Sequence, residues 1–298
     1  AVGRETLILE KVNKKNDLVI LYALFQSSPL ILLSKKSSGI KTIKDFENKR
    51  VMTTLDDSNE ISLKSMISSS NIDINSLKFL KHSHNIIDLI NNKTDLISGY
   101  ISKSPYILKK LGIKYNVFEP KNYGFDMYSD FLYTSKKLAK MNKNVVKAFK
   151  KASLLGWKYA YSNIDESVNV IINKYNTENL SKDELIFEAE ELKKISYLNT
   201  YKLGDIKHSK LNRIYDLYKV MGLINSNRKL KDFIFEDTHS SIVLNEKEEN
   251  FIINNPKIIL GSDKTKNPYI IQNEDGLISG YENEVLTLIN KVSGANFV

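Results

Sequence analysis

Apolar residues in the first half of the chain alternate between short continuous runs and helical spacing. Residues 18–24 and 30–33 are continuous apolar runs with the length and β-branched content of buried strands. Shorter runs with strand character follow at 51–53, 77–80, 95–100, 115–118 and 130–134. Helical segments are predicted at 4–15, 42–48, from about 59, 85–91 and 105–111. Strands that alternate with helices predict an α/β fold with a mostly parallel sheet.

The second half of the chain has a different pattern. Helical periodicity is strong at 144–161, 164–175, 182–195 and 207–220, and weak over 225–244. After a short helix and Pro256, a new α/β unit begins with a strand at 257–261, a hairpin at 273–276 and a helix at 281–292. We therefore divide the chain into a domain at 1–235, a linker at 236–256 and a truncated second unit at 257–298. The second unit is too short to bury a core of its own.

The loop after the strand at 51–53 is the first candidate site. In open α/β sheets, ligands bind beyond the carboxyl ends of strands and beside helix N-termini. Asp57 or Ser58 is placed to cap the next helix, and Glu60 lies in its first turn. The loop at 54–60 is therefore expected to face a ligand. The alternative, which the pattern alone favours, is that these polar residues only cap the helix.

A second polar interruption, FQSSP at 25–29, separates the two long apolar runs. One interpretation is a strand bend, in which Pro29 removes a ladder donor. The other is a cleft segment, in which Gln26 and Ser28 offer hydrogen-bonding groups and Phe25 offers a stacking surface. Residues 99–100 and 123–126 are expected to be the places where the chain passes between two lobes.

Composition excludes several classes of function. The net charge is +9, but Lys is spread along the whole chain without an Arg cluster or basic block, so nucleic acid is not an expected partner. The absence of Cys excludes thiol catalysis, Cys-ligated zinc, iron–sulfur clusters and disulfides. No apolar run of membrane-spanning length and no signal peptide is recognised in these residues.

Candidate catalytic and metal-binding residues are few. His82 and His84 are placed to share one face of a strand, but no third ligand follows at useful spacing, so zinc is not expected. Glu188, Glu190 and Glu191 lie on an amphipathic helix and are better interpreted as its solvated face. No dinucleotide-binding, phosphate-loop or nucleophile-elbow motif occurs. The sequence therefore favours a binding protein over an enzyme, with no metal and no cofactor.

Five stretches, in order, resemble the periplasmic solute-binding proteins of the thiamine-precursor (pyrimidine) type, which also cover alkanesulfonate- and nitrate-like binders. They are VGRETLIL at 2–9, SSGIKTIKDFENKRV at 37–51, NNKTDLISGY at 91–100, PKNYGFDMYSDFLYTSKKL at 120–138 and VVKAFKKASLLGWKYAYSNIDESVNVI at 145–171. The resemblance covers about residues 1–235. It implies a two-lobed, type II (Venus-flytrap) α/β fold with hinge crossings and a helical C-terminal part. The family's first strand and helix, which usually contribute an aromatic to the ligand, are expected to precede Ala1.

By this resemblance, ligand contacts come from the loops that face the cleft between the lobes. The candidate ligand-binding residues are Arg4, Glu5, Phe25, Gln26, Ser28, Asp57, Ser58, Glu60, Tyr100, Tyr123 and Asp126. Phe25, Tyr100 and Tyr123 would stack on a planar ring. Glu60, Gln26 and Asp126 would accept hydrogen bonds from that ring, and Arg4 would meet an anionic or carbonyl group.

The segment 258–294 resembles the opening of an amino-acid-type (family 3) solute-binding domain. An acidic residue usually follows the Gly–aromatic pair of that pattern, and Glu282 and Glu284 fill this region. Two such domains in tandem resemble the extracytoplasmic sensor region of a bacterial membrane histidine kinase or diguanylate cyclase. Residues 1–3 and 296–298 look like interrupted strands, which indicates a fragment or a processed chain.

The expected function is extracytoplasmic, or periplasmic, binding of a small organic ligand, with a planar heterocycle such as a pyrimidine favoured. The resemblance implies a sensor that is tethered to the membrane through segments outside this chain, and a homodimer is one assembly open to it. The alternative is a stand-alone substrate-binding protein of an ABC uptake transporter. An enzyme is the third interpretation.

Overall fold

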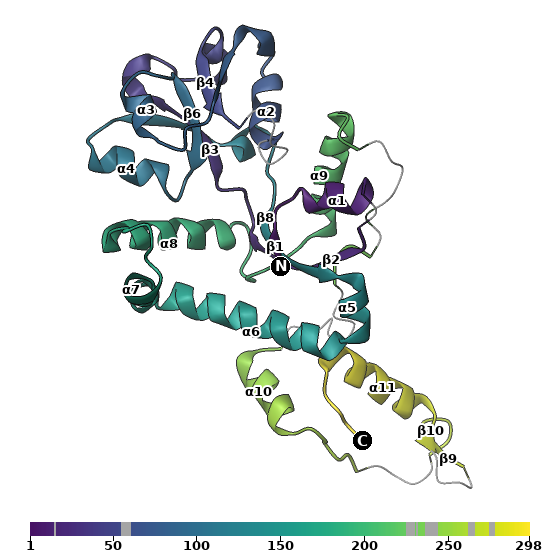
Figure 1. The fold of residues 1–298 in the computed structure, drawn as a ribbon. Helices are drawn as coiled ribbons and strands as arrows, with labels where there is room; N and C mark the ends of the chain where they lie inside the picture. The colour runs from purple at the N-terminus through teal and green to yellow at the C-terminus, as the bar shows by residue number, and fades with distance from the viewer. Residues whose placement is uncertain are drawn as a thin grey trace. The chain divides into compact units, whose positions relative to one another are not determined.

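The structure is a computed structural model that describes residues 1–14, 16–54, 61–224, 230, 232–235, 244–261, 266–273 and 278–298. The chain separates into two compact units, Ala1–Phe235 and Glu236–Val298 (Figure 1). Unit 1 contains two lobes, each built around its own sheet. We define lobe 1 as residues 1–25 and 129–235, and lobe 2 as residues 30–118.

Lobe 1 is built on a three-stranded antiparallel sheet. The strand order is β1 (Val2–Gly3), β8 (Ser129–Ser135), β2 (Leu18–Phe25). Helices α1 (Leu7–Val12) and α9 (His208–Val220) pack on one face, and α6 (Lys143–Ser162) and α8 (Lys182–Ser196) on the other. Because both faces are covered, β2 is apolar along its whole length. The chain returns to this sheet at residues 233–235, where the Ile20 N–H donates to the Phe233 carbonyl oxygen at 2.7 Å.

The helices of lobe 1 follow the predicted pattern with two differences. α6, α7 (Ile164–Lys174), α8 and α9 lie close to the predicted ranges. α5 (Lys136–Met141) was not predicted; the Ser135 hydroxyl caps it by accepting a hydrogen bond from the Leu138 N–H at 3.1 Å. α1 is shorter than the helix predicted at 4–15, because the residues before Leu7 form a turn.

Lobe 2 is built on a five-stranded mixed sheet. The strand order is β5 (Lys78–Lys81), β4 (Arg50–Thr53), β6 (Leu96–Tyr100), β3 (Leu30–Lys35), β7 (Tyr115–Phe118). β4 pairs in parallel with β5 and β6, whereas β3 is antiparallel to both of its neighbours. The prediction of a mostly parallel sheet holds for part of lobe 2 and is wrong for lobe 1. Apolar runs predict that strands exist, but not the direction in which they pair.

Both faces of the lobe 2 sheet are covered as well. Leu30 and Leu32 of β3 pack with α2 (Ile61–Ser68) and the 3₁₀-helix η2 (Ile43–Phe46). Ile31 and Leu33 point to the other face, as alternation along a strand requires, and pack with α3 (Ile87–Ile90) and α4 (Ser104–Lys110). Two further short 3₁₀-helices in the described part of this lobe are η1 (Lys36–Ser38) and η4 (Ile74–Ser76).

Two segments of the chain pass between the lobes. The first crossing, residues 26–29, joins β2 to β3, and the second crossing, residues 119–128, joins β7 to β8 through η5 (Pro120–Tyr123). The second crossing is where we predicted it. The prediction of a crossing at residues 99–100 is wrong, because β6 continues into α4 within lobe 2. Gly99 serves close packing there instead, since a Cβ at this position would clash with the Ser104 hydroxyl.

Unit 2 contains two helices and a small hairpin in its described residues. These are α10 (Glu246–Asn254), β9 (Ile271–Gln272), β10 (Ile278–Ser279) and α11 (Tyr281–Ser293). The strand predicted at 257–261 is reduced to an isolated bridge between Ile258 and Phe297. Among the described residues of this unit, Ile270 and Ala295 are the buried hydrophobic residues, whereas Ile259 and Tyr281 are 79% and 63% exposed. So little burial is what a chain segment of this length can supply.

No helix in the described ranges is both long and apolar enough to cross a bilayer.

An ion pair between Arg50 and Asp95 fastens β4 beside β6. The guanidinium donates from Nη2 to Asp95 Oδ1 at 2.8 Å and from Nε to Oδ2 at 3.0 Å, and the Arg50 backbone N–H also donates to Oδ2 at 2.9 Å. The Arg50 hydrogen bonds lower the pKa of Asp95 below its ordinary value, although partial burial opposes this.

We predict that Asp95→Asn lowers thermal stability at pH 7. The pKa of Asp95 is lower in the folded state than in the unfolded state. The Asp95 carboxylate therefore contributes its full share of the free energy of unfolding above the unfolded-state pKa of about 4, and this share is lost as pH falls through the folded-state pKa. The loss at pH 7 should be no more than about 1 kcal/mol, since Arg50 is partly exposed to solvent. Melting temperatures of wild type and variant should converge as pH falls towards 3, whereas the exposed-site control Glu47→Gln should show no such trend. A gap that stays constant with pH would contradict this assignment.

Candidate functional site

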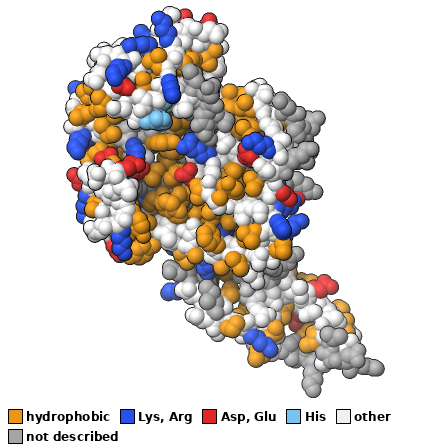
Figure 2. All heavy atoms as spheres, viewed as in Figure 1, with side chains coloured by type: hydrophobic (Ala, Val, Ile, Leu, Met, Phe, Trp, Pro, Cys, Tyr) orange, Lys and Arg blue, Asp and Glu red, His pale blue; other side chains and the backbone are white. Residues whose placement is uncertain are grey.

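A cavity of about 270 Å³ lies in lobe 2 at the carboxyl ends of β4, β5 and β6. Since these three strands are parallel, their carboxyl ends meet at one edge of the sheet. The polar lining residues are Thr54, His82, His84, Ser98, Tyr100, Lys103 and Ser104, and the apolar ones include Leu30, Ile86, Ile97 and Ile107. Figure 2 shows the His side chains in pale blue beside hydrophobic side chains on this part of the surface.

The cavity lies next to the loop that the sequence singled out. Thr54, the first residue of that loop, lines the cavity. Asp57, Ser58 and Glu60 lie outside the residues that the structure describes. Their assignment to the site stays a prediction.

His82 is held in one tautomer by two hydrogen bonds. Its Nδ1 accepts the backbone N–H of His84 at 2.8 Å, so its Nε2 carries the proton and donates to the Ser98 carbonyl oxygen at 2.8 Å. The two imidazole rings lie 4.6 Å apart, between centroids. Both nitrogens of His82 are thus occupied, and the described residues contain no group of three His, Asp or Glu side chains placed to hold a metal ion. His82 and His84 present flat rings to the cavity.

Arg4 and Tyr100, both predicted as ligand residues, contact each other across the cleft. Arg4 follows β1 in lobe 1, and its Nη2 donates to the hydroxyl of Tyr100 at the end of β6 in lobe 2. The Arg4 Cζ lies 5.7 Å from the centre of the Tyr100 ring, within cation–π range. Burial works against the charge of Arg4, but Tyr100, the neighbouring Glu5 and Asp130 outweigh it and raise the pKa of Arg4 above its ordinary value. Tyr100 therefore lines the cavity and contacts lobe 1 at the same time.

Acidic residues surround this guanidinium on the lobe 1 side. Glu5 is only 2% exposed, and its charge acts on Arg4. Burial raises the pKa of Asp130, while Arg4 lowers it. Asp130 also adopts a left-handed backbone conformation, with φ of 53°. The arrangement places a cation between the lobes, and two acidic residues of lobe 1 act on it electrostatically.

Phe25 lies in the core of lobe 1 and not at the cleft. Its side chain is 4% exposed and packs in the cluster that includes Leu24, Leu132 and Val146. The hypothesis that Phe25 stacks on a ligand is therefore corrected. The sequence grouped Phe25 with the polar interruption at 25–29, but β2 extends through Phe25, so its side chain belongs to the strand and packs in the core of lobe 1.

Gln26, Ser28 and Asp126 belong to the crossings. The Gln26 side chain is 6% exposed and donates to the carbonyl oxygens of Ala23 at 3.2 Å and Asp205 at 3.0 Å. The Ser28 hydroxyl accepts the Leu30 N–H at 3.3 Å. These contacts brace the backbone between the lobes. Both hydrogen bonds use the side-chain nitrogen, so the predicted role of Gln26 as an acceptor through its side-chain oxygen stays a prediction.

Lys210 of α9 joins the two crossings. Its Nζ donates to the Gln26 carbonyl oxygen at 2.6 Å and forms an ion pair with Asp126 Oδ2. The ammonium also lies 4.7 Å from the centre of the Tyr128 ring. Burial lowers the pKa of Lys210, and Asp126 partly offsets this. Asp126 thus takes part in the contact between the crossings through Oδ2, and its predicted hydrogen bond to a ligand stays a prediction.

Tyr123 is 40% exposed on η5 and does not line the cavity in lobe 2. Its predicted stacking role is not supported by a contact in this structure and stays a prediction.

A further contact between the lobes runs along α4. Lys103 pairs with Glu178 at 3.3 Å, and the Tyr106 ring lies 5.5 Å from the Phe187 ring of α8. Glu188, expected on a solvated face, is half-buried; burial raises its pKa and Lys103 lowers it. Lys103 thus lines the cavity and contacts the opposite lobe, as Tyr100 does.

Sequence reasoning did not assign His82, His84, Lys103 or Ser104 to the site. His82 and His84 follow β5, and Lys103 and Ser104 follow β6. Their positions just beyond strand ends were the available signal.

The family model described as "NMT1/THI5 like" matches residues 1–167 of the chain. This chain belongs to that family. A curated relative, the formylaminopyrimidine-binding protein of Halalkalibacterium halodurans, is 26% identical over 136 residues, which is 45% of this chain. The match spans 40% of the length of that relative.

Solved structures share the fold. The periplasmic aliphatic sulphonate-binding protein SsuA from Escherichia coli aligns with a TM-score of 0.59 at 14% identity, covering 82% of this chain and 77% of that one. The alkanesulfonate-binding protein SsuA from Xanthomonas axonopodis pv. citri, bound to MOPS, aligns with a TM-score of 0.58 at 11% identity and covers 78% of each chain. The desulfurization enzyme DSZB also shares the fold, with a TM-score of 0.56, 10% identity and coverage of 79% of this chain and 82% of that one.

The predicted fold class is confirmed: the chain has the α/β, two-lobed fold of periplasmic solute-binding proteins. Because the same fold occurs in an enzyme, the fold alone does not identify a function.

We predict that Lys210→Met destabilises unit 1 by about 2–3 kcal/mol, because it leaves the Asp126 carboxylate partly buried without its cation. The loss is smaller than for a fully buried pair, since both side chains keep some solvent contact. The double variant Lys210→Met/Asp126→Asn, which removes both charges, should recover most of the stability. Chemical denaturation measures both. A double variant no more stable than Lys210→Met would show that the carboxylate is not the cause.

Proposed function

We propose that unit 1 is an extracytoplasmic receptor that binds a small planar heterocycle, of the formylaminopyrimidine class, in the cleft between its lobes. The observation that carries this proposal is the lobe 2 cavity, whose aromatic and cationic lining residues contact lobe 1 across the cleft. The family match and the name of the curated relative supply the ligand class. A cavity of about 270 Å³ is slightly smaller than the roughly 300–1,000 Å³ typical of drug-sized ligands, which suits a single ring.

The side chains around the cavity suit such a ligand. Tyr100 and the imidazole rings of His82 and His84 offer flat surfaces to a heterocycle. Lys103 and Ser104 offer donors to ring nitrogens or to a formyl oxygen. Arg4, whose guanidinium already reaches Tyr100, is placed to meet a carbonyl or anionic group that enters the cleft.

The carboxylate that would accept hydrogen bonds from an exocyclic amino group is proposed to come from the loop at 54–60. Asp57, Ser58 and Glu60 lie three, four and six residues after Thr54, which lines the cavity. Glu60 is the strongest candidate, since a carboxylate accepting from an amino group forms a charge-assisted hydrogen bond.

For the whole protein, two roles follow from such a receptor. In one it delivers its ligand to an ABC uptake transporter; the ligand-binding component of an ABC-type import system from Staphylococcus aureus shares its fold. In the other it is a membrane-tethered sensor, and residues 257–298, after a linker at 236–256, form the first part of an amino-acid-type solute-binding domain. The hairpin of β9 and β10 followed by α11, which begins after Gly280 with Glu282 and Glu284 in its first turn, supports the second role. A transmembrane helix with kinase or cyclase modules in the complete gene would favour the sensor.

The binding experiment is isothermal titration of the 298-residue chain with formylaminopyrimidine. We predict binding that weakens at least about tenfold in Tyr100→Ala, because stacking on an aromatic ring, together with the apolar area that it buries, contributes about 1.4 kcal/mol or more. Glu60→Gln should weaken binding by a similar factor, if its carboxylate is the charged partner. Tyr175→Ala, at a 68% exposed position on the helical part, is the matched control and should leave affinity unchanged.

A titration with alkanesulfonates separates the ligand class from the site. Sulfonate binding that depends on Tyr100, without pyrimidine binding, would correct the ligand and retain the cleft. Pyrimidine binding that is indifferent to Tyr100 and Glu60 would place the site elsewhere.

A further inference from the structure

Helix α6 carries two apolar faces, and among the described residues only one of them is buried in a core. Val146 and Tyr161 are 4% exposed, and Trp157 packs against the same core of lobe 1. On the opposite side of α6, large apolar side chains are exposed to solvent. They are Val145, Phe149, Leu155 and Tyr159, exposed by 63%, 60%, 54% and 54%.

These outer residues form one stripe along the helix. Val145, Phe149, Ala152, Leu155 and Tyr159 are spaced by four, three, three and four residues, the spacing of a single helical face, and Ala152 is exposed too. The stripe runs over most of a 20-residue helix, about 30 Å long. Met141, just before the helix, is 71% exposed.

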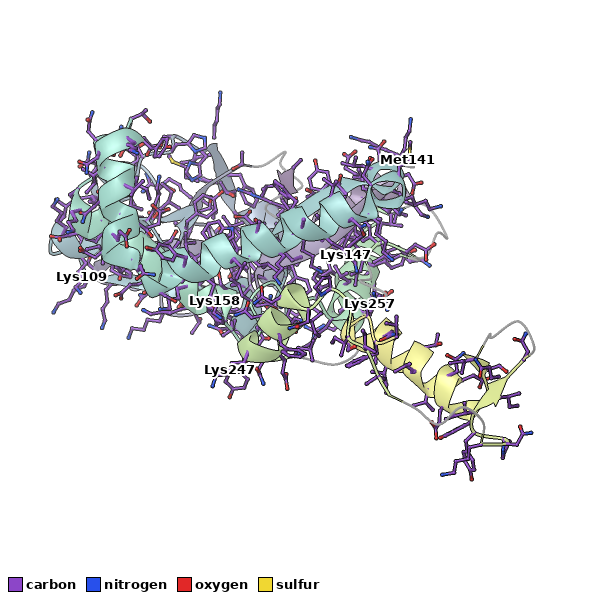
Figure 3. The ribbon with its side chains drawn as sticks, turned by 90° about the horizontal axis from the view of Figure 1, so that it is seen from below. Lys109, Met141, Lys147, Lys158, Lys247 and Lys257 are labelled. Atoms are coloured by element: carbon purple, nitrogen blue, oxygen red, sulfur yellow. The ribbon has the colours of Figure 1, made fainter. Side chains whose placement is uncertain are left out.

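A row of lysines lies beside this stripe. Lys147, Lys151 and Lys158 are spaced by four and seven residues, so they share one side of α6. Figure 3 shows Met141, Lys147 and Lys158 along the helix. Between residues 136 and 163 the sequence contains eight Lys and no Asp or Glu. The next acidic residues along the chain, Asp165 and Glu166, begin α7, where Glu166 accepts a hydrogen bond from the Tyr159 hydroxyl at 2.8 Å.

We propose that the outer face of α6 docks on the surface of an anionic phospholipid bilayer, with the helix lying in the plane of the interface. An apolar stripe flanked by lysines is the pattern of an interfacial amphipathic helix: the apolar side chains enter the acyl boundary and the lysines meet the headgroups. Phe149 and Tyr159 have the aromatic rings favoured at that depth.

The charge chemistry selects lipid over protein as the partner. All the basic residues of the segment are Lys, which is depleted at protein–protein interfaces, where Arg is enriched. Lys attracted to an anionic leaflet needs no fixed hydrogen-bond geometry, since the attraction comes from surface potential. The proposal is independent of the ligand cleft, because it uses none of the residues that line it.

The test is co-sedimentation of the full 298-residue chain with vesicles of phosphatidylcholine alone and of phosphatidylcholine mixed with phosphatidylglycerol. We expect binding to the mixed vesicles only, and weaker binding as salt is raised. Lys151→Glu/Lys158→Glu should reduce partitioning at least about tenfold, and so should Phe149→Ser. All three positions are exposed, so circular dichroism and thermal unfolding should match wild type.

The matched control is Lys44→Glu/Lys78→Glu, which makes the same change in net charge at two exposed positions of lobe 2. It should retain vesicle binding. Equal loss in the control, or no binding to the anionic vesicles by wild type, would overturn the proposal. A wild-type dimer in sedimentation velocity that Phe149→Ser dissociates, without any vesicle binding, would also overturn it and assign the stripe to a second copy of the chain.

Discussion

The ammonium group of Lys210 is the point at which the two interlobe crossings are held together. One crossing accepts its hydrogen bond through the Gln26 carbonyl oxygen, and the other pairs with it through Asp126. The group comes from α9, which packs firmly in the core of lobe 1 through Leu211, Ile214 and Tyr218. Both crossings are therefore held against the same helix, α9, through this one side chain. The relative position of the lobes, and with it the width of the cleft, therefore depends on the contacts of Lys210 with Gln26 and Asp126.

The contacts between the lobes explain how a ligand bound in the cavity can affect both lobes of unit 1. Tyr100 and Lys103 line the cavity, and both also touch lobe 1, through Arg4 and Glu178 respectively. A ligand that engages either side chain changes a contact between the lobes. A receptor needs this coupling, because a transporter or a signalling module responds to the relative position of the lobes and not to the ligand itself. Glu188 of lobe 1 is half-buried, and Lys103 of lobe 2 acts on its charge. The environment of Glu188 therefore also depends on how closely the two lobes approach each other.

Helices and strands could be predicted from the sequence more accurately than the contacts between residues that are distant in the chain. The apolar run at 18–24 was recognised because β2 is covered on both faces, and the helices from α6 to α9 because each keeps its apolar spacing. α5 was missed, since its residues have little apolar periodicity and its start depends on the Ser135 cap. Phe25 was misplaced because it adjoins the polar residues at 26–29, whereas β2 continues through Phe25 into the core of lobe 1. His82 and Lys103 lie far apart in the sequence, and only the parallel pairing of β5, β4 and β6 brings them to one cavity.

The central claim is that a small ligand in the cleft sets the arrangement of the two lobes. The chain contains no Cys, so spin labels can be placed at Lys44→Cys in lobe 2 and Val220→Cys in lobe 1, both exposed, without removing native thiols. Pulsed electron paramagnetic resonance then measures the distance between the lobes. The account predicts that saturating formylaminopyrimidine narrows the distance distribution to a single population, and that Tyr100→Ala prevents this. A distribution that is unchanged while calorimetry shows the ligand bound would contradict it.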